Sequence, residues 1–228
     1  MAKRAALRYS PAAMKHDSFI TLPFKLERKP PRFETNEIKY PESMGRYFLK
    51  KYTQPGDRVF DPFSGLGTTL FVAEEMGRIP YGVEYEAQRH LWVAGQLKDW
   101  RNLVHGDSAK LASYGFPKMD FAMTSPPYMP NHHKWNPLFA GDPKKAGYDV
   151  YLRRMAKIFS ELPKIMKRNA YVMVQVDNLP GRTYTPLVRD IGLAVSKSFR
   201  PETEIVIAWS GRRGSEPRHT HCLLFKNV

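Results

Sequence analysis

The hydrophobic pattern of the chain changes near residue 41. Residues 1–40 are basic and interrupted by proline, and their apolar residues follow no regular period. From residue 41 onward, short apolar runs alternate with amphipathic stretches, which is typical of strands alternating with helices. The predicted strands are 58–61, 81–84, 102–105, 119–124, 170–176, 204–209 and 219–225. The predicted helices are 41–52, 68–76, 87–97, a stretch from 148 to the bend at Pro163, and one that opens at Thr185-Pro186.

This alternation predicts an α/β fold with seven strands, mainly parallel, and helices on both faces of the sheet. The link at 210–218 is too short for a helical crossover, so the last strand should pair antiparallel with the strand before it. We therefore expect a basic N-terminal arm at 1–40 followed by one α/β domain at 41–228, a length suited to a single core.

Composition adds a charge argument. The 228 residues include 36 Lys and Arg against 22 Asp and Glu, a formal net charge of +14. Such an excess favours a polyanionic partner, although many small proteins are basic without one. A single cysteine, Cys222, allows no internal disulfide and no thiolate metal cluster, and no apolar run approaches the length of a membrane span. We expect a cytoplasmic protein, associated with the nucleoid of a prokaryote.

A glycine-containing turn follows the first predicted strand. Gly65 and Gly67 lie between that strand and the next helix, where small residues let backbone amides approach a polar ligand. Glu84 ends the second predicted strand, where a carboxylate can accept both hydroxyls of a ribose, and Asp107 follows the third, near an adenine amino group. Each carboxylate taken singly could instead be a solvated loop residue.

Two segments resemble one enzyme family. Asp61-Pro62-Phe63-Ser64-Gly65-Leu66-Gly67-Thr68-Thr69 resembles the cofactor motif of S-adenosylmethionine-dependent amino-methyltransferases. Thr124-Ser125-Pro126-Pro127-Tyr128 resembles their catalytic motif in the Ser-Pro-Pro-Tyr form, which is typical of DNA cytosine-N4 methyltransferases. The form that begins with Asp or Asn is more typical of adenine-N6 and of some RNA guanine-N2 enzymes.

The resemblance covers about residues 40–226 and implies a Rossmann-like class I methyltransferase fold with S-adenosyl-L-methionine as cofactor. The cofactor-binding residues that it implies are Asp61, Pro62, Phe63, Ser64, Gly65, Gly67, Thr68, Thr69, Glu84, Asp107, Ser108 and Thr124. The catalytic residues that it implies are Ser125, Pro126, Pro127 and Tyr128. No metal site is expected, since the adjacent His132 and His133 have no cysteine or carboxylate at ligand spacing.

The chemistry explains these residue types. The exocyclic amine of cytosine is a poor nucleophile because its lone pair is delocalised into the ring. The Ser125 hydroxyl and the Pro126 carbonyl can each accept one N–H, and the proline pair holds these acceptors in place. Tyr128 would stack on the base. Carbon-5 methylation instead needs a thiolate beside the base, and Cys222 lies inside a predicted strand.

The segment 129–147 is expected to contact nucleic acid at the active edge, because it combines cations with aromatic side chains. The proposed nucleic-acid-binding residues are His132, His133, Lys134, Trp135, Lys144, Lys145, Arg182, Arg212 and Arg213. A solvated basic surface is the alternative. The target base of a duplex would have to be flipped out or already unpaired.

Substrate choice stays open at this point. Larger relatives have a separate target-recognition region, for which this chain has no obvious room, so sequence recognition must come from the loops, the basic arm or a second subunit, or be weak. The leading hypothesis is a DNA cytosine-N4 methyltransferase. The second is an amino-methyltransferase that acts on adenine or on structured RNA, and the third is a cofactor-binding nucleic-acid module without turnover. A homodimer and a cognate restriction endonuclease are compatible with the leading hypothesis.

Overall fold

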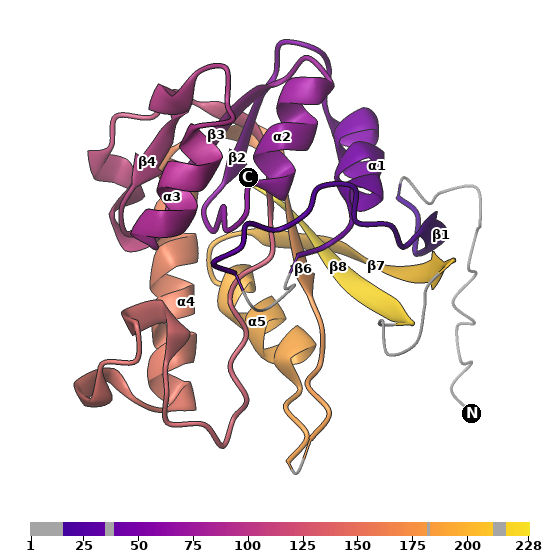
Figure 1. Cartoon of the computed structure of the whole chain (residues 1–228). Coiled ribbons are helices and arrows are strands. Elements are labelled where there is room, and N and C mark those ends of the chain that lie inside the picture. Colours follow the sequence, from indigo (N-terminus) through magenta and orange to yellow (C-terminus); the bar gives the residue numbers. More distant parts are fainter. Residues whose placement is uncertain (1–15, 35–38, 182, 212–217) are drawn as a thin grey trace, which may run out of the picture.

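The computed structural model describes residues 16–34, 39–181, 183–211 and 218–228 (Figure 1). The strands are β1 (Phe19–Pro23), β2 (Arg58–Asp61), β3 (Ile79–Glu84), β4 (Leu103–His105), β5 (Met119–Thr124), β6 (Met166–Val176), β7 (Arg200–Ser210) and β8 (His219–Lys226). The α-helices are α1 (Glu42–Tyr52), α2 (Thr68–Glu75), α3 (Ala87–Ala94), α4 (Tyr148–Glu161) and α5 (Leu187–Ser196). Short 3₁₀ helices span Trp100–Asn102, Ser108–Ser113, Pro137–Phe139, Pro143–Lys145 and Leu162–Lys164.

The eight strands of the described residues form one sheet in the order β1-β7-β8-β6-β5-β2-β3-β4. Strand β8 is antiparallel to both of its neighbours, β6 and β7, and every other pairing is parallel. The predicted α/β class, the mainly parallel sheet and the antiparallel last strand are confirmed. The predicted number of seven strands is wrong, because the N-terminal segment supplies an eighth.

That additional strand, β1, pairs in parallel with β7, for example through Ile20↔Ile207 and Leu22↔Trp209. Ile20 and Leu22 pack against the buried cluster beneath α1, while the alternate residue Phe19 is 63% exposed. Only two apolar side chains of β1 face the core, and its hydrogen-bonding partner lies far along the chain. A local hydrophobic pattern is therefore too weak to reveal it.

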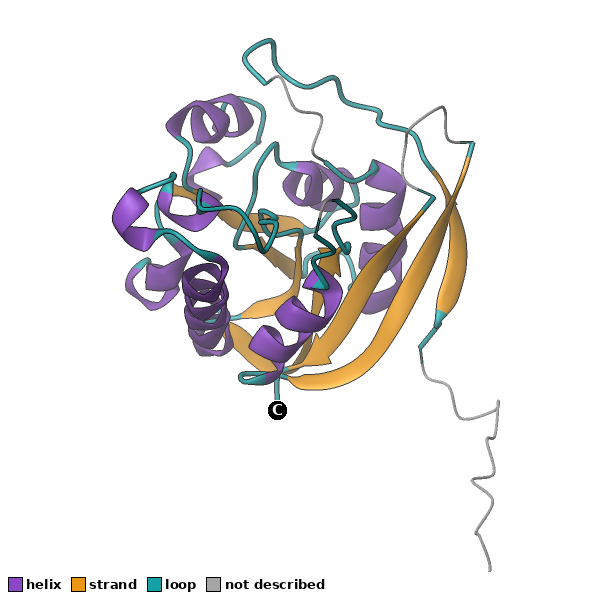
Figure 2. Ribbon diagram, turned by 90° about the horizontal axis from the view of Figure 1, so that it is seen from below, coloured by secondary structure: helices purple, strands orange, loops and turns teal. Residues whose placement is uncertain are grey.

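Helices cover both faces of the curved sheet (Figure 2). Helices α1 and α2 pack on one face, where Met44 and Phe48 contact a cluster that includes Phe121 of β5. Helices α4 and α5 pack on the other, where Tyr151 and Ile191 belong to a second cluster. Because successive residues of a strand point to opposite faces, β5 contributes to both clusters and is buried on both sides.

Three predicted strands begin earlier than the pattern indicated: β3 starts at Ile79, two residues before the predicted start, and β6 and β7 start four residues before theirs. Strand β6 starts at Met166, where it pairs with Met119, and a register shift with Asn169 at φ 65° separates this start from the apolar run. Strand β7 starts at Arg200, which pairs with Lys226. Helix α3, in contrast, ends at Ala94, before the predicted end at 97. Across the described residues, we find no helix with the length and apolar character that crossing a membrane demands.

Candidate functional site

Asp61, the last residue of β2, is the centre of a buried hydrogen-bond network. Its Oδ2 accepts a hydrogen bond from the Thr69 hydroxyl at 2.6 Å, and its Oδ1 accepts one from the Thr124 hydroxyl at 2.6 Å. The backbone N–H of Phe63 also donates to Oδ1, at 2.9 Å. Burial raises the pKa of Asp61 to about 6, and the three hydrogen bonds oppose that rise. The carboxylate thus joins α2 and the end of β5 at one point.

The glycine turn between β2 and α2 is closely packed. Gly67 has φ +73°, and a Cβ added there would lie 2.8 Å from Cγ1 of Val93 on α3. Gly65 has φ +51°, and its N–H donates to Oε2 of Glu84 at 2.6 Å. The N–H of Glu86 donates to the other oxygen of Glu84 at 2.8 Å. Glycine is therefore required at 67 for both backbone conformation and space.

Glu84 ends β3 and is 6% exposed. Burial raises its pKa, while the backbone donors of Glu86 and Gly65 oppose the rise. Within the described part of the chain, neither Asp61 nor Glu84 forms a salt bridge. Two buried carboxylates without a paired cation suit a ligand that brings a positive charge and hydroxyl donors of its own.

A third side chain at this edge is Asp107, which follows β4. It forms a salt bridge with Arg154 of α4, whose guanidinium lies 4.9 Å from the centre of the Phe139 ring. The neighbouring Ser108 hydroxyl donates a hydrogen bond to the carbonyl of Pro62 in the glycine turn. The loops after β2 and β4 are thereby held together, and Phe139 brings the segment 129–147 to the same place.

The segment Ser125 to Tyr128 continues directly from β5, so the hydrogen bond between Thr124 and Asp61 places it beside the glycine turn. The Tyr151 hydroxyl donates to the Pro127 carbonyl at 2.9 Å and so supports the segment from α4. The Tyr128 ring packs against the core and is partly exposed, but its hydroxyl is buried. That burial raises the pKa of Tyr128 well above its ordinary value.

Sequence reasoning missed a further carboxylate, Asp177, which follows β6. Its Oδ2 accepts hydrogen bonds from Gln175 Nε2 at 3.0 Å and from the Thr220 hydroxyl at 2.8 Å. Its Oδ1 accepts the N–H of His221 at 3.1 Å. Burial raises the pKa of Asp177, and its charge acts on Tyr128. The signal that could have revealed Asp177 is its position just after the carboxyl end of a predicted strand, like that of Asp107.

Tyr40 was also missed. Its hydroxyl is hydrogen-bonded to that of Thr69, and burial raises the pKa of Tyr40. It precedes α1 in the segment assigned to the arm, where no pattern distinguishes a site residue from a packing residue.

The segment 129–147 has a defined local structure. Asn136 is fully buried, and its side chain donates to the carbonyl of Lys145 at 2.9 Å and accepts the N–H of Leu138 at 3.1 Å. Around this buried amide, the six predicted contact residues of the segment are all exposed: His132, His133, Lys134, Trp135, Lys144 and Lys145. The remaining three, Arg182, Arg212 and Arg213, lie outside the described residues.

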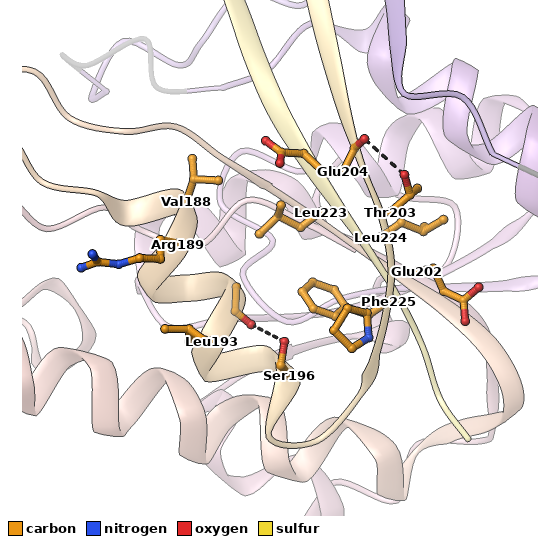
Figure 3. A pocket seen from close by; sticks show the side chains of 12 residues that line it. Val188, Arg189, Leu193, Ser196, Glu202, Thr203, Glu204, Leu223, Leu224 and Phe225 are labelled. Atoms are coloured by element: carbon orange, nitrogen blue, oxygen red, sulfur yellow. Dashed lines mark hydrogen bonds between the residues drawn. The ribbon is translucent and has the colours of Figure 1, made fainter. Parts of the chain in front are cut away.

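A pocket of about 420 Å³ lies elsewhere, between α5 and the paired strands β7 and β8 (Figure 3). Leu193 and Ser196 of α5 line one side, and Thr203 and Phe225 line the other. It contains none of the predicted site residues.

The mainly parallel sheet, with helices on both faces and the candidate site at the carboxyl ends of its strands, defines a class I methyltransferase fold. Comparisons with known proteins agree with this fold. Residues 15–94 match the family model N6_N4_Mtase, described as DNA methylase. A stretch of 50 residues, 22% of this chain, is 44% identical to the Type II methyltransferase M.BglII of Bacillus subtilis and covers 14% of that protein. The resemblance to DNA amino-methyltransferases is confirmed over residues 15–94, a range that includes the glycine turn and ends before Ser125.

Three solved structures show the same fold at low sequence identity. TrmN from Thermus thermophilus has a TM-score of 0.58 and 16% identity over 82% of this chain and 49% of TrmN. A putative rRNA-methylase from Clostridium thermocellum has a TM-score of 0.54 and 13% identity over 84% of this chain and 100% of its own. A methyltransferase from Pyrococcus furiosus has a TM-score of 0.54 and 15% identity over 90% of this chain and 89% of its own.

Proposed function

We propose that this chain transfers the methyl group of S-adenosylmethionine to the exocyclic N4 amino group of cytosine in DNA. The observation that carries the proposal is the hydrogen bond between Thr124 and Asp61, 2.6 Å long. It joins the loop whose sequence matches DNA methylases to the segment Ser125 to Tyr128. Two adjacent parallel strands thus present a cofactor loop and an acceptor segment at the same edge, where open α/β sheets bind ligands.

The residues at this edge fit the cofactor. Asp61 would bind the α-amino group of the cofactor, Glu84 its ribose hydroxyls and Asp107 its adenine amino group. The turn at Gly65 and Gly67 would leave room for its methionine portion. The remaining cofactor positions are Pro62, Phe63, Ser64, Thr68, Thr69, Ser108 and Thr124. When bound, S-adenosylmethionine supplies a methyl group activated by a positively charged sulfur.

The chain's own contribution to the reaction is placement. The Ser125 hydroxyl and the Pro126 carbonyl would accept the two N–H bonds of the target amine, so that its nitrogen faces the methyl group. Pro127 is held through its carbonyl by Tyr151, and Tyr128 would stack on the base. Because the donor is already activated, alignment and exclusion of water supply most of the rate enhancement, and a strong general base is not required.

DNA is the proposed partner. A target base inside a duplex must leave the stack to reach this edge, and the exposed cations and Trp135 of the segment 129–147 would contact the phosphates and unpaired bases. A DNA substrate would place the protein in the cytoplasm at the nucleoid. The homodimer, the restriction endonuclease partner and the division at residue 41 stay predictions.

Adenine N6 is the second candidate, because the matching family model covers both N6 and N4 enzymes by its name. Ser125 favours cytosine in our proposal, since the acidic or amide form of the motif is more typical of adenine enzymes.

The test is to incubate the protein with methyl-labelled S-adenosylmethionine and either unmodified DNA or total RNA, then identify labelled nucleosides by mass spectrometry. N4-methylcytosine from DNA is the expected product. Labelled N6-methyladenine would overturn the base assignment, and label in RNA alone would overturn the DNA assignment.

A matched pair of variants tests the acceptor segment. Ser125→Ala is expected to lower the rate about 100-fold by removing an oriented acceptor. Ser160→Ala removes an exposed hydroxyl of α4 that donates to Lys157, and it should leave the rate unchanged. Equal rates for both variants would contradict the role of Ser125.

A further inference from the structure

The described residues of the segment that follows β6, 178–181 and 183–186, project from the molecule as a narrow finger, the orange loop at the lower edge of Figure 1. Leu179 and Thr185 form an antiparallel pair at its base, with N–H···O distances of 3.1 and 3.0 Å. Beyond this pair Pro180, Gly181 and Thr183 are exposed, and Tyr184 is 59% exposed. Tyr184 thus presents a largely exposed aromatic ring on a hairpin-like loop.

The base of the finger is fixed to the body. The Thr185 side chain is fully buried, and its hydroxyl accepts the N–H of Asn131 at 3.0 Å. The Asn131 side-chain amide donates to the carbonyl of Tyr184 at 3.2 Å. On the other side, the Asn178 side chain accepts the N–H of Val188 at 3.1 Å. The ring of Tyr184, which is mostly exposed, is therefore carried by an ordered support.

The support places the finger beside the proposed active site. Asn131 lies three residues after Tyr128 in the chain, and it connects the finger to the segment 129–147. Asp177, which acts on Tyr128 by its charge, lies immediately before the finger. The finger, the acceptor segment and the proposed DNA-contacting segment therefore leave the sheet at one edge.

We infer that Tyr184 is a wedge that enters the DNA duplex at the position from which the target base is extruded. The inference rests on the proposed function and adds a residue to it. Extrusion breaks a base pair and two stacking contacts, and it leaves a gap in the duplex. A planar side chain that fills the gap replaces part of the lost stacking, as inserted side chains do in proteins that distort DNA.

An exposed aromatic residue can also be an unremarkable part of a surface. Trp100 provides the comparison: it is 60% exposed, but it lies between α3 and β4, at the end of the sheet opposite to the acceptor segment. The two residues have similar exposure and differ in their support and position. The wedge role predicts different consequences when each is truncated.

The experiment uses two duplexes of the sequence found methylated in DNA. In one the target base is fully paired, and in the other it lies opposite an abasic position, so that little pairing energy opposes its extrusion. Tyr184→Ala is expected to lower the methylation rate of the paired duplex about 10- to 100-fold and to leave the second duplex within about threefold of wild type. Tyr184→Phe keeps the ring and should behave like wild type on both, as should Trp100→Ala.

A fluorescent 2-aminopurine in place of the target base reports extrusion without turnover. We expect wild type and Tyr184→Phe to increase its fluorescence in the paired duplex and Tyr184→Ala to increase it much less. Equal losses on both duplexes, or no loss on either, would overturn the wedge. Wild-type protein that methylates neither duplex would contradict the proposed function and this inference with it, whereas wild-type turnover with an unaffected Tyr184→Ala contradicts the wedge alone.

Discussion

Replacing Asp61 with asparagine is expected to flatten the dependence of stability on pH. Burial raises the pKa of this carboxyl from 3.8 to about 6, so the folded protein binds its proton more tightly than the unfolded chain does. The stabilisation is fully present below the unfolded pKa and is lost as pH rises from about 3.8 to 6. A difference of about 2 pH units corresponds to ~3 kcal/mol. Asp61→Asn removes this contribution.

Urea unfolding at several pH values between 3.5 and 7.5, chosen to bracket this window, measures the effect. The quantity of interest is the difference in the free energy of unfolding between wild type and Asp61→Asn at each pH, since contributions from other carboxylates cancel. This difference should shift by ~3 kcal/mol in favour of the variant between the lowest and the highest pH. Asp142→Asn, at an exposed carboxylate, controls for the loss of one negative charge.

The same carboxyl should govern cofactor affinity. A ligand with a cationic amino group binds the ionised form, so affinity should be constant above pH 6 and fall about tenfold per pH unit below it. S-adenosylhomocysteine keeps the amino group and lacks the sulfonium charge, so it should show the same pH profile in calorimetry. Asp61→Asn should bind both weakly and without this profile. Parallel pH curves for the stability of wild type and Asp61→Asn would refute the assignment of the raised pKa.

Three further predictions concern Gly67, Cys222 and Thr124. Gly67→Ala combines a positive φ with a close contact and should lower the free energy of unfolding by ~2–4 kcal/mol. Gly115 has a similar φ but open space around it, so Gly115→Ala should lower that free energy by only ~1 kcal/mol. Urea unfolding measures both. Cys222→Ala should keep the rate of methyl transfer within a few-fold of the wild-type rate. The thiol of the wild-type protein should resist alkylation, since burial raises its pKa. Rapid alkylation of the folded protein would contradict this burial. Thr124→Val removes a donor to Asp61 and should weaken cofactor binding about tenfold with little change in fold by circular dichroism. Unchanged binding would show that this hydrogen bond does not serve the cofactor.

Sequence patterns predicted the parts of the fold that have a strong local signal. The run that ends at Asp61 is buried on both faces, and the glycines that follow it mark a strand-to-helix turn. The order of the chemistry-bearing residues along the chain also predicted that Asp61 and Thr124 lie at one edge, because parallel strands place their carboxyl ends together. The hydrogen bond that joins them depends on side-chain geometry, which no pattern specifies.

What the patterns missed is non-local. Strand β1 has only short apolar alternation, and it becomes a strand by pairing with β7. Two of the three donors to Asp177, Thr220 and His221, lie on a strand more than forty residues away. The role of Tyr40 depends on the hydrogen bond between its hydroxyl and that of Thr69 on α2. In each case a partner distant in sequence determines what the residue does. A local sequence pattern does not contain that partner, so it cannot predict the role of the residue.

The pairing of β1 with β7 sets an order of events during synthesis. Ile20 and its partner Ile207 are separated by 187 residues (207 minus 20). At ribosomal rates of 5–20 residues per second, the segment of β1 waits about 10 to 40 s for its partner strand. The central strands β2, β3 and β5 need no residue beyond 124 to pair with one another. Strand β1 therefore precedes the other described strands in synthesis but can join the sheet only after β7 is made, and its two apolar side chains stay open to chaperones throughout that interval.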